Sequence, residues 1–368
     1  MGEGTRIKLA DPCVGKPEED AVLRVLRSGR LVAGPRVEEF EGRLASFAGR
    51  AHAVAVSSGT AALLAAMESM DVGPGSVVVV PAFTFPAPAI VAAFLGAEVR
   101  ACDVDPATFN LSPDTLSPVL DDDVSLVVAI DQFGVPSPVI HIEDMLRERG
   151  IPVLVDAACS LGSTLGDRRC GSFGKAATFS FHPRKVITTG EGGVVLTDDD
   201  DIAARVRRFR NIGMEDGGFL SLGLNLRPSE IGAAIGLCQL DRIEDIVGRR
   251  RALARRYRAL GLDLQGSPDN TELNHQTLAA TLRTGADRDA LIRALAHEGV
   301  EAQVASYCLG SLPRLAKKLN IDDTRTPVAK RLHNLGIALP MHEDLKDSDV
   351  DYTVGLVHDW LKKENPVK

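Results

Sequence analysis

The chain has 368 residues, of which 45% are hydrophobic and 25% are charged, and 42 Lys and Arg against 50 Asp and Glu give a net charge of −8. This composition is typical of a globular protein, so it excludes a disordered or fibrous chain, and the acidic balance disfavours a nucleic-acid partner. The six cysteines form no paired spacing, which indicates a reducing compartment, and we expect a cytoplasmic protein. The length favours two domains.

The first part of the chain alternates helical patterns with short apolar runs. Residues 36–48 carry apolar side chains at helical spacing, residues 53–56 form a short apolar run, and residues 61–70 are again helical. These runs have the lengths of a helix, a buried strand and a second helix.

Residues 72–97 contain no charged side chain and are long enough to raise the question of a membrane span. Several prolines and glycines interrupt them, and a bilayer would leave the freed backbone groups unsatisfied. We therefore expect a buried strand at 77–80 and a helix at 87–95, and no membrane partner.

Two further apolar runs, at residues 124–130 and 151–155, are of strand length. Helices that alternate with continuous apolar strands are typical of a parallel sheet with helices on both faces. We predict an α/β fold built on a mainly parallel sheet.

The pattern changes after Ser229. Apolar residues from 231 to 247 at helical spacing predict one long amphipathic helix that continues into the basic stretch 249–256. Because Glu244 and Asp245 interrupt the positive charge, we interpret this stretch as a helix with a solvated or interface face rather than a nucleic-acid patch.

Beyond residue 262, a strand pattern at 278–282 and a helical pattern at 288–297 predict a smaller α+β domain. We place the boundary near Val247, which gives a large domain of residues 1–247 and a small C-terminal domain of residues 248–368. No His pair or Cys pair has the spacing of a metal site, so we expect no metal.

Three polar features lie at the predicted strand ends. The turn Ser57–Thr60 opens a helix, where free backbone N–H groups can bind a phosphate, although such residues also serve as ordinary helix caps. Asp156 follows an apolar strand, at the edge where ligands bind in open α/β sheets, and Lys185 precedes the glycine-rich turn 190–193. Alone, the turn is more often an ordinary helix cap and Lys185 a surface lysine, and Asp156 is equally a solvated strand-end carboxylate. Together they fit pyridoxal 5'-phosphate (PLP), which needs a lysine, a carboxylate for its ring nitrogen and a phosphate site.

Several ordered motifs carry a resemblance to a known family: Val56–Leu63, Pro81–Phe85, Asp103–Pro106, Val155–Ala158, Gly171–Gly174, Phe179–Lys185, Thr188–Gly193, Arg210–Met214 and Asn225–Ile231. In this order they resemble the DegT/DnrJ/EryC1/StrS family of PLP-dependent sugar aminotransferases. The resemblance implies the fold type I architecture, which is that of aspartate aminotransferase: a large domain with a mainly parallel sheet, a small C-terminal α+β domain, and a homodimer whose active sites use both subunits.

The resemblance also implies roles for single residues. Lys185 is the Schiff-base lysine and Asp156 the partner of the ring nitrogen. Gly59, Thr60 and Ser180 bind the cofactor phosphate together with Asn225 of the second subunit. Phe85 stacks on the cofactor ring.

Some positions depart from the family pattern. Cys159 stands where many members carry a Gln that contacts the ring hydroxyl, and Leu161 stands where they carry a His. Tyr307 is not followed by the His that can face a nucleotide-linked sugar in relatives. Arg227 and His275 match positions that can face substrate, although His275 is equally interpreted as a structural histidine.

The function that follows is transfer of an amino group from glutamate or glutamine to a keto-sugar, specifically a nucleotide-linked 3- or 4-keto-deoxysugar, in amino-sugar, polysaccharide or antibiotic biosynthesis. A cyclitol or another cyclic ketone is an alternative acceptor. A PLP-dependent sugar dehydratase is a second alternative, disfavoured because such relatives carry His at the position of Lys185. A non-catalytic PLP-binding regulator is the third.

Overall fold

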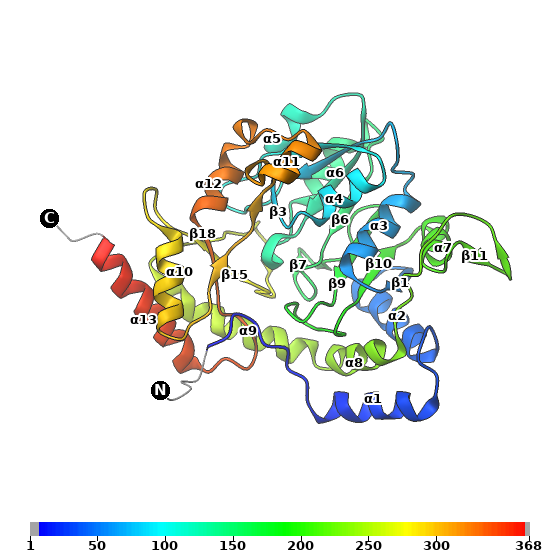
Figure 1. The fold of residues 1–368 in the computed structure, drawn as a ribbon, viewed down its shortest axis with the longest axis horizontal. Coiled ribbons are helices and arrows are strands. Elements are labelled where there is room, and N and C mark those ends of the chain that lie inside the picture. The colour runs from blue at the N-terminus through cyan, green and yellow to red at the C-terminus, as the bar shows by residue number, and fades with distance from the viewer. Residues whose placement is uncertain (1–6, 365–368) are drawn as a thin grey trace.

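The computed structural model describes residues 7–364, and a seven-stranded sheet forms its centre. The strands lie in the order β1-β10-β9-β6-β5-β2-β4 (Figure 1), with bounds β1 His52–Val56, β10 Gly193–Thr197, β9 Ala176–Ser180, β6 Val153–Asp156, β5 Val124–Ile130, β2 Val77–Pro81 and β4 Glu98–Cys102. Pairings from β9 to β4 are parallel, whereas β10 is antiparallel to both β9 and β1. The predicted α/β fold with a mainly parallel sheet is confirmed.

Helices cover both faces of this sheet. One face packs against α2 (Pro35–Ala48), α6 (Val139–Arg147) and α8 (Glu230–Leu240), and the other against α3 (Gly59–Ser69), α4 (Ala87–Phe94) and α7 (Asp200–Phe209). In β2, Val77 and Val79 belong to the first core and Val78 and Val80 to the second. A strand buried on both faces must be apolar at every position, which explains its continuous valine run.

The uncharged stretch 72–97 forms β2 and α4, as predicted, with the short strand β3 (Phe83–Thr84) between them. Within residues 7–364, no helix is both long enough and apolar enough to cross a bilayer. Pro88 is compatible with α4 because it lies in the first turn of this helix, where its missing N–H costs no hydrogen bond.

The chain reverses direction between β9 and β10, so residues 181–192 form a loop at the carboxyl end of β9. At this edge Gly193 lies against the start of α3: a Cβ on Gly193 would lie 2.3 Å from the carbonyl oxygen of Ser58. The reversal therefore places the loop that carries Lys185 beside the turn that opens α3.

The predicted single helix from 231 into the basic stretch is wrong, because the chain forms two helices there, α8 and α9 (Ile243–Tyr257). Arg242 leaves helical geometry (φ −117°, ψ 18°), and its guanidinium donates to the carbonyl of Cys13 and to the carboxylate of Glu18. The basic stretch is also not wholly solvated, since Arg250 is 2% exposed and pairs with Glu343.

A second, smaller sheet has the order β13-β15-β18-β16 and packs against α10, α13 and the second half of α9. Its elements are β13 Asp263–Leu264, β15 Leu278–Thr281, β18 Gly336–Leu339, β16 Gln303–Val304, α10 Arg288–His297 and α13 Asp347–Glu364. The core that α2, α6 and α8 form with the large sheet ends at Val247, and the core of the small sheet begins at Leu253. Ile7 also pairs with Val300, next to this second core. The division into domains at residue 247 stays a prediction.

The remaining elements lie around these two sheets. They are α1 Lys16–Ser28, α5 Pro113–Leu116, α11 Pro313–Leu319, α12 Pro327–Leu335, β7 Thr164–Leu165, β8 Arg168–Arg169, β11 Met214–Glu215, β12 Gly218–Phe219, β14 Thr271–Glu272 and β17 Tyr307–Cys308. Short 3-10 helices occupy Ser117–Val119, Gln132–Gly134, Arg258–Leu260, Leu309–Ser311 and Asp323–Arg325. β17, from the C-terminal part of the chain, pairs with β3, so that Tyr307 lies opposite Thr84.

Candidate active site

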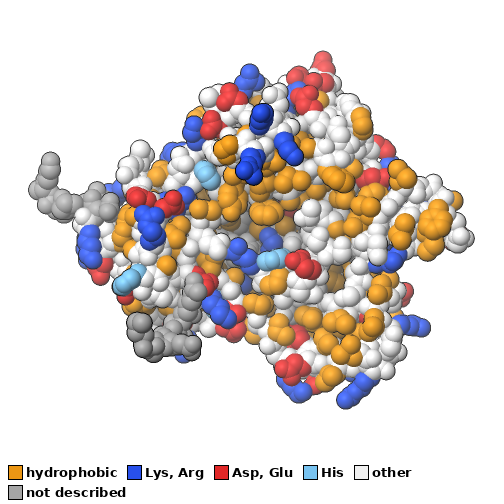
Figure 2. Space-filling view, viewed as in Figure 1, with side chains coloured by type: hydrophobic (Ala, Val, Ile, Leu, Met, Phe, Trp, Pro, Cys, Tyr) orange, Lys and Arg blue, Asp and Glu red, His pale blue; other side chains and the backbone are white. Residues whose placement is uncertain are grey.

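A cavity of about 620 Å³ opens at the carboxyl ends of β6 and β9, between the seven-stranded sheet and the C-terminal part of the chain. Figure 2 shows it as the hollow near the middle of the molecule, with hydrophobic side chains along its upper rim. We call it the central cavity. Residues from both sheets line it, from β6 and β9 of the large sheet and from β16 and β18 of the small one, together with residues of α3 and β17.

The first turn of α3 forms one end of the central cavity. Ser58 caps this helix by accepting a hydrogen bond from the N–H of Ala61, which leaves the N–H groups of Gly59 and Thr60 without an acceptor inside the helix. Ser180, at the end of β9, lies so close that a Cβ on Gly59 would sit 2.7 Å from its Cβ. Two free amides, a hydroxyl and the positive end of the helix therefore form a cradle for a phosphate.

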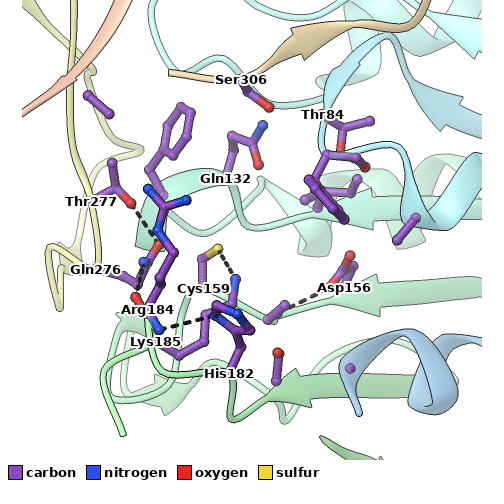
Figure 3. A pocket seen from close by; sticks show the side chains of 18 of the residues that line it. Thr84, Gln132, Asp156, Cys159, His182, Arg184, Lys185, Gln276, Thr277 and Ser306 are labelled. Atoms are coloured by element: carbon purple, nitrogen blue, oxygen red, sulfur yellow. Dashed lines mark hydrogen bonds between the residues drawn. The ribbon is translucent and has the colours of Figure 1, made fainter. Parts of the chain in front are cut away.

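Asp156, the last residue of β6, lies on the floor of the cavity and is 8% exposed. One carboxylate oxygen accepts a hydrogen bond from the N–H of Ala158 at 3.1 Å (Figure 3). Burial raises the pKa of Asp156, and the Ala158 amide and the positive charge of Lys185 act in the opposite direction. Because few groups offset the cost of burying this negative charge, the carboxylate favours a cationic N–H partner in the cavity.

Lys185 reaches the same cavity from the loop that follows β9. Its ammonium donates a hydrogen bond to the Cys159 sulfur at 3.1 Å, and its backbone N–H donates to the carbonyl of His182 (Figure 3). In the described part of the chain the lysine has no carboxylate partner. Its amine is therefore held in the cavity by a weak acceptor and remains available for bond formation and proton transfer.

Two buried side chains fix the turn that carries Cys159. Asp131, 2% exposed, accepts hydrogen bonds from the Ser160 hydroxyl at 2.6 Å and from the N–H of Ser137 at 2.9 Å. Asn274, fully buried, donates to the carbonyls of Cys159 and Leu161. The cavity floor is therefore rigid, and burial raises the pKa of Asp131 to about 6.

The structure adds polar residues that the sequence did not single out. Figure 3 shows Thr84, Gln132, Gln276, Thr277 and Ser306 on the walls of the central cavity. Gln132 lies two residues after the end of β5, and Asp156 is the last residue of β6, so the same strand-end rule could have found Gln132. The others come from segments that only the tertiary fold brings to the site.

Two basic side chains near Lys185 also line the cavity. Arg184 donates from its guanidinium to Gln303, and its backbone N–H donates to Nδ1 of His182 (Figure 3). Burial first, and then the charges of Lys185 and Arg184, lower the pKa of His182. His182 is therefore neutral at pH 7, with Nδ1 as an acceptor.

Not every predicted site residue meets in this cavity. Phe85 lines it but is 66% exposed. Asn225 and Arg227 lie outside it, in the segment that pairs with Asn211. His275 lies in a second cavity of about 210 Å³. The structure thus gathers Gly59, Thr60, Phe85, Asp156, Cys159, Ser180 and Lys185, and leaves the other three apart.

The residues present fit PLP. The glycine-lined phosphate cradle, the buried carboxylate and the lysine lie around one cavity, in the kinds and number that this cofactor needs. Among residues 7–364, no group of three or more His, Cys, Asp and Glu side chains could hold a metal ion. Fold and site together define a PLP-dependent enzyme of fold type I.

Comparison with known proteins identifies the family. The model of the DegT/DnrJ/EryC1/StrS aminotransferase family matches residues 12–358, and the chain belongs to this family. It is 32% identical to GDP-perosamine synthase of Caulobacter vibrioides over 98% of this chain and 100% of the relative. It is 31% identical to dTDP-4-dehydro-2,3,6-trideoxy-D-glucose 4-aminotransferase of Saccharopolyspora spinosa, over 94% of each chain.

Solved structures of aminotransferases have the same fold as this chain. The chain superposes on Spr1654 from Streptococcus pneumoniae, in its PMP-form, with a TM-score of 0.93 and 25% identity, over 98% of this chain and 100% of that one. The same protein has also been solved in a PLP-form. The protein is an aminotransferase, and its cofactor is PLP.

Proposed function

We propose that this aminotransferase moves an amino group from glutamate or glutamine to a nucleotide-linked 3- or 4-keto-deoxysugar, in amino-sugar, polysaccharide or antibiotic biosynthesis. The observation that carries the proposal is the convergence of the α3 cradle, Asp156 and Lys185 on one cavity. The names of the two curated relatives, each of which refers to a nucleotide-linked sugar, support this class of acceptor.

The cofactor contacts follow from the cavity. Gly59, Thr60 and Ser180 bind the phosphate, because they offer two amides and a hydroxyl at a helix start. Phe85 covers one face of the ring, since an aromatic side chain packs well on a flat heterocycle. Cys159 takes the place from which relatives contact the ring hydroxyl.

Bound PLP supplies an electron sink for the carbon that loses its proton. Asp156 keeps the proton on the ring nitrogen, which its buried negative charge favours. The amine of Lys185 removes the proton from the α-carbon of the donor and later returns a proton to the carbon that receives the amino group. The rigid turn under Cys159 holds the lysine at the place where both transfers occur.

The walls of the cavity suit a sugar. Thr84, Gln132, Thr277 and Ser306 are neutral hydrogen-bonding residues, which can bind hydroxyl and carbonyl groups without placing a charge opposite them. Arg184 adds a positive charge for the carboxylate of the donor or the phosphates of the acceptor. These residues therefore provide for both substrates in one site.

We also propose a homodimer with shared active sites. Asn225 is exposed and lies outside the cavity of its own chain, so it is free to reach the phosphate in a second subunit. Hydrophobic side chains gather on the nearby hairpin β11–β12 at the right edge of Figure 2, including the exposed Phe219, Leu220 and Leu222. Exposed apolar patches of this kind are typical of protein interfaces.

Complementation between subunits tests the shared site. Lys185→Ala and Asn225→Asp each inactivate the homodimer. When equal amounts of the two variants are mixed and exchange subunits, half of the dimers contain one chain of each variant, and each mixed dimer has one intact site. We therefore expect the mixture to regain about a quarter of the wild-type activity. Mixed samples that stay as inactive as the separate variants would contradict sharing.

The cellular location is part of the proposal. All six cysteines are unpaired in the structure. Unpaired thiols are typical of a reducing compartment, so we infer that the protein acts in the cytoplasm.

The visible absorption spectrum tests the first half of the reaction. With L-glutamate or L-glutamine, the band of the lysine-linked cofactor gives way to that of the amine form in the wild type and not in Lys185→Ala. The loaded enzyme then consumes a nucleotide-linked 3- or 4-keto-deoxysugar faster than the same sugar without its nucleotide. Equal rates with both sugars would remove the nucleotide from the proposal, and conversion of cyclic ketones alone would replace the acceptor class.

A further inference from the structure

A second cavity, of about 210 Å³, lies behind the segment 274–277, and Phe133 and Thr277 line both it and the central cavity. We call it the rear cavity. Its volume is below the roughly 300–1,000 Å³ of cavities that hold drug-sized ligands. A small ion or the end of a larger molecule is the occupant that fits.

The charged side chains that line the rear cavity are all positive. Arg255, in the last turn of α9, and Arg258, just after it, line the cavity, and within residues 7–364 neither side chain forms an ion pair or a hydrogen bond. Other arginines of the same helix do pair with carboxylates: Arg249 with Asp347, Arg250 with Glu343, Arg251 with Glu272 and Arg256 with Asp347 and Asp351. Among the described residues no Asp or Glu lines the cavity. Two exposed positive charges therefore have no carboxylate partner there, in a chain with a net charge of −8.

His275 lines the same cavity, near the charges of both arginines, and is held in place from both sides. Its backbone has a positive φ of 48°, and the neighbouring side chains Asn274 and Gln276 donate to the carbonyls of Cys159 and Arg184. In the described structure the imidazole has no hydrogen-bond partner. Burial, and then the surrounding arginines, lower the pKa of His275 to about 4, so the neutral ring has one N–H to donate.

We propose that Arg255, Arg258 and His275 form a binding site for a phosphate group, separate from the cofactor cradle. Guanidinium groups bind phosphate oxygens through paired N–H donors, and the imidazole N–H supplies a further donor. Gln265 also lines the cavity, and its side-chain N–H group is already used by the carbonyls of Thr108 and Gln132. The nitrogen donors left for the anion are therefore those of the three basic side chains, and the hydroxyl of Ser267 also lines the cavity.

The size and charge of the rear cavity select the ligand. Phosphate carries up to two negative charges at pH 7, which match the two unpaired arginines, and its four oxygens can meet all three donors at once. Inorganic phosphate and small phosphate monoesters share this chemistry. A complete nucleotide-linked sugar is too large for the volume, so the site is not a second acceptor site.

Titration calorimetry of the PLP-loaded protein with inorganic phosphate tests the proposal, because the cofactor fills the cradle at α3. The wild type binds one phosphate saturably, and Arg255→Gln/Arg258→Gln binds it at least about 100-fold more weakly, since each charged hydrogen-bonding partner contributes about tenfold. The matched control is Arg256→Gln, a neighbour on α9 whose side chain pairs with Asp347 and Asp351 and does not line the cavity. It binds phosphate within about twofold of the wild type.

A second variant protects the test against loss of folding in the first. His275→Asn keeps a residue that tolerates positive φ and removes the imidazole donor, so phosphate binds about tenfold more weakly. A parallel titration uses glycerol 3-phosphate, and binding of both ligands must depend on the two arginines. If glycerol 3-phosphate binds more tightly than inorganic phosphate, the ligand is an organic phosphate; if it binds more weakly, the ligand is the free ion. Equal phosphate affinity in wild type and the double variant, or no saturable binding to the wild type, would overturn the proposal.

Discussion

The floor of the central cavity and its outer wall hold their side chains in different ways. On the floor, Asp156 ends β6, and Cys159 lies on the following turn, which Asp131 and Asn274 fix through buried hydrogen bonds. On the outer wall, Phe85 is 66% exposed, and its hydrocarbon side chain has no donor or acceptor through which a hydrogen bond could fix it. The groups that hold a proton are therefore preorganised by one chain, whereas the groups that cover the ligands are open to solvent or to another subunit.

The largest effect is expected on the floor, at Lys185. Among the described residues, Lys185 is the only lysine that lines the central cavity, and we expect Lys185→Ala to lower transamination by about 10⁴-fold or more. The measurement is turnover with saturating donor and acceptor.

The matched control is Lys175→Ala. Lys175 pairs with Asp199 at the surface and does not line the central cavity, so its loss leaves turnover unchanged. Residual activity of Lys185→Ala at a tenth of the wild-type rate would show that another group moves the proton.

Asp156→Asn is expected to have the next largest effect. The amide keeps the size of the side chain and its hydrogen bond from Ala158, but it removes the charge that stabilises a protonated ring, so kcat falls by about 10³-fold. Rapid-mixing absorbance of the first half-reaction measures it, with the exposed Asp123→Asn as the control. An unchanged rate in Asp156→Asn would mean that the ring nitrogen needs no carboxylate here.

A third prediction concerns the support under the floor. Burial raises the pKa of Asp131 to about 6, so the folded chain binds a proton that the unfolded chain releases between pH 4 and pH 6. The free energy of unfolding therefore falls as pH rises through this window, by at most about 3 kcal/mol, and stays constant above it.

Asp131→Asn removes this titration while keeping the side-chain shape. Urea unfolding at pH 4.5 and pH 7.5 then shows a smaller loss of stability for the variant than for the wild type. The same loss in both proteins would show that Asp131 is ionised in the folded state throughout.

The smallest effect is expected on the outer wall. Phe85→Ala removes a stacking surface, so the dissociation constant of PLP rises by about fivefold to tenfold, while the stability of the chain changes by less than about 0.5 kcal/mol. Fluorescence titration of the cofactor measures the first and urea unfolding the second.

Phe94→Ala is the matched control, because Phe94 is 76% exposed on α4 and does not line the central cavity. It changes neither quantity. Equal weakening of cofactor binding by both variants would assign the effect to α4 rather than to stacking.

The sequence predicted the floor better than the wall, for a physical reason. Asp156 and the α3 turn follow directly from local pattern, because a strand end and a helix start fix their positions in an α/β sheet. Thr277 and Ser306 reach the cavity only because the small sheet packs beside the large one, and local pattern contains no sign of this contact.

The same limit explains the error at α8 and α9. The apolar spacing continues without interruption from Ile231 to Val247, so periodicity alone predicts one helix. The break at Arg242 comes from its contacts with Cys13 and Glu18, which are more than 200 residues away along the chain.

The pairing of β17 with β3 has a consequence for how ligands enter and leave. This two-strand ladder joins the C-terminal part of the chain to the segment that follows β2, at the edge of the central cavity, and Leu309 adds a further backbone hydrogen bond to Ala82. A hinge motion that swung the two halves apart would have to break these bonds at every catalytic cycle. We therefore expect substrates and products to pass beside Phe85 and Tyr307, where movement of side chains alone can open the central cavity.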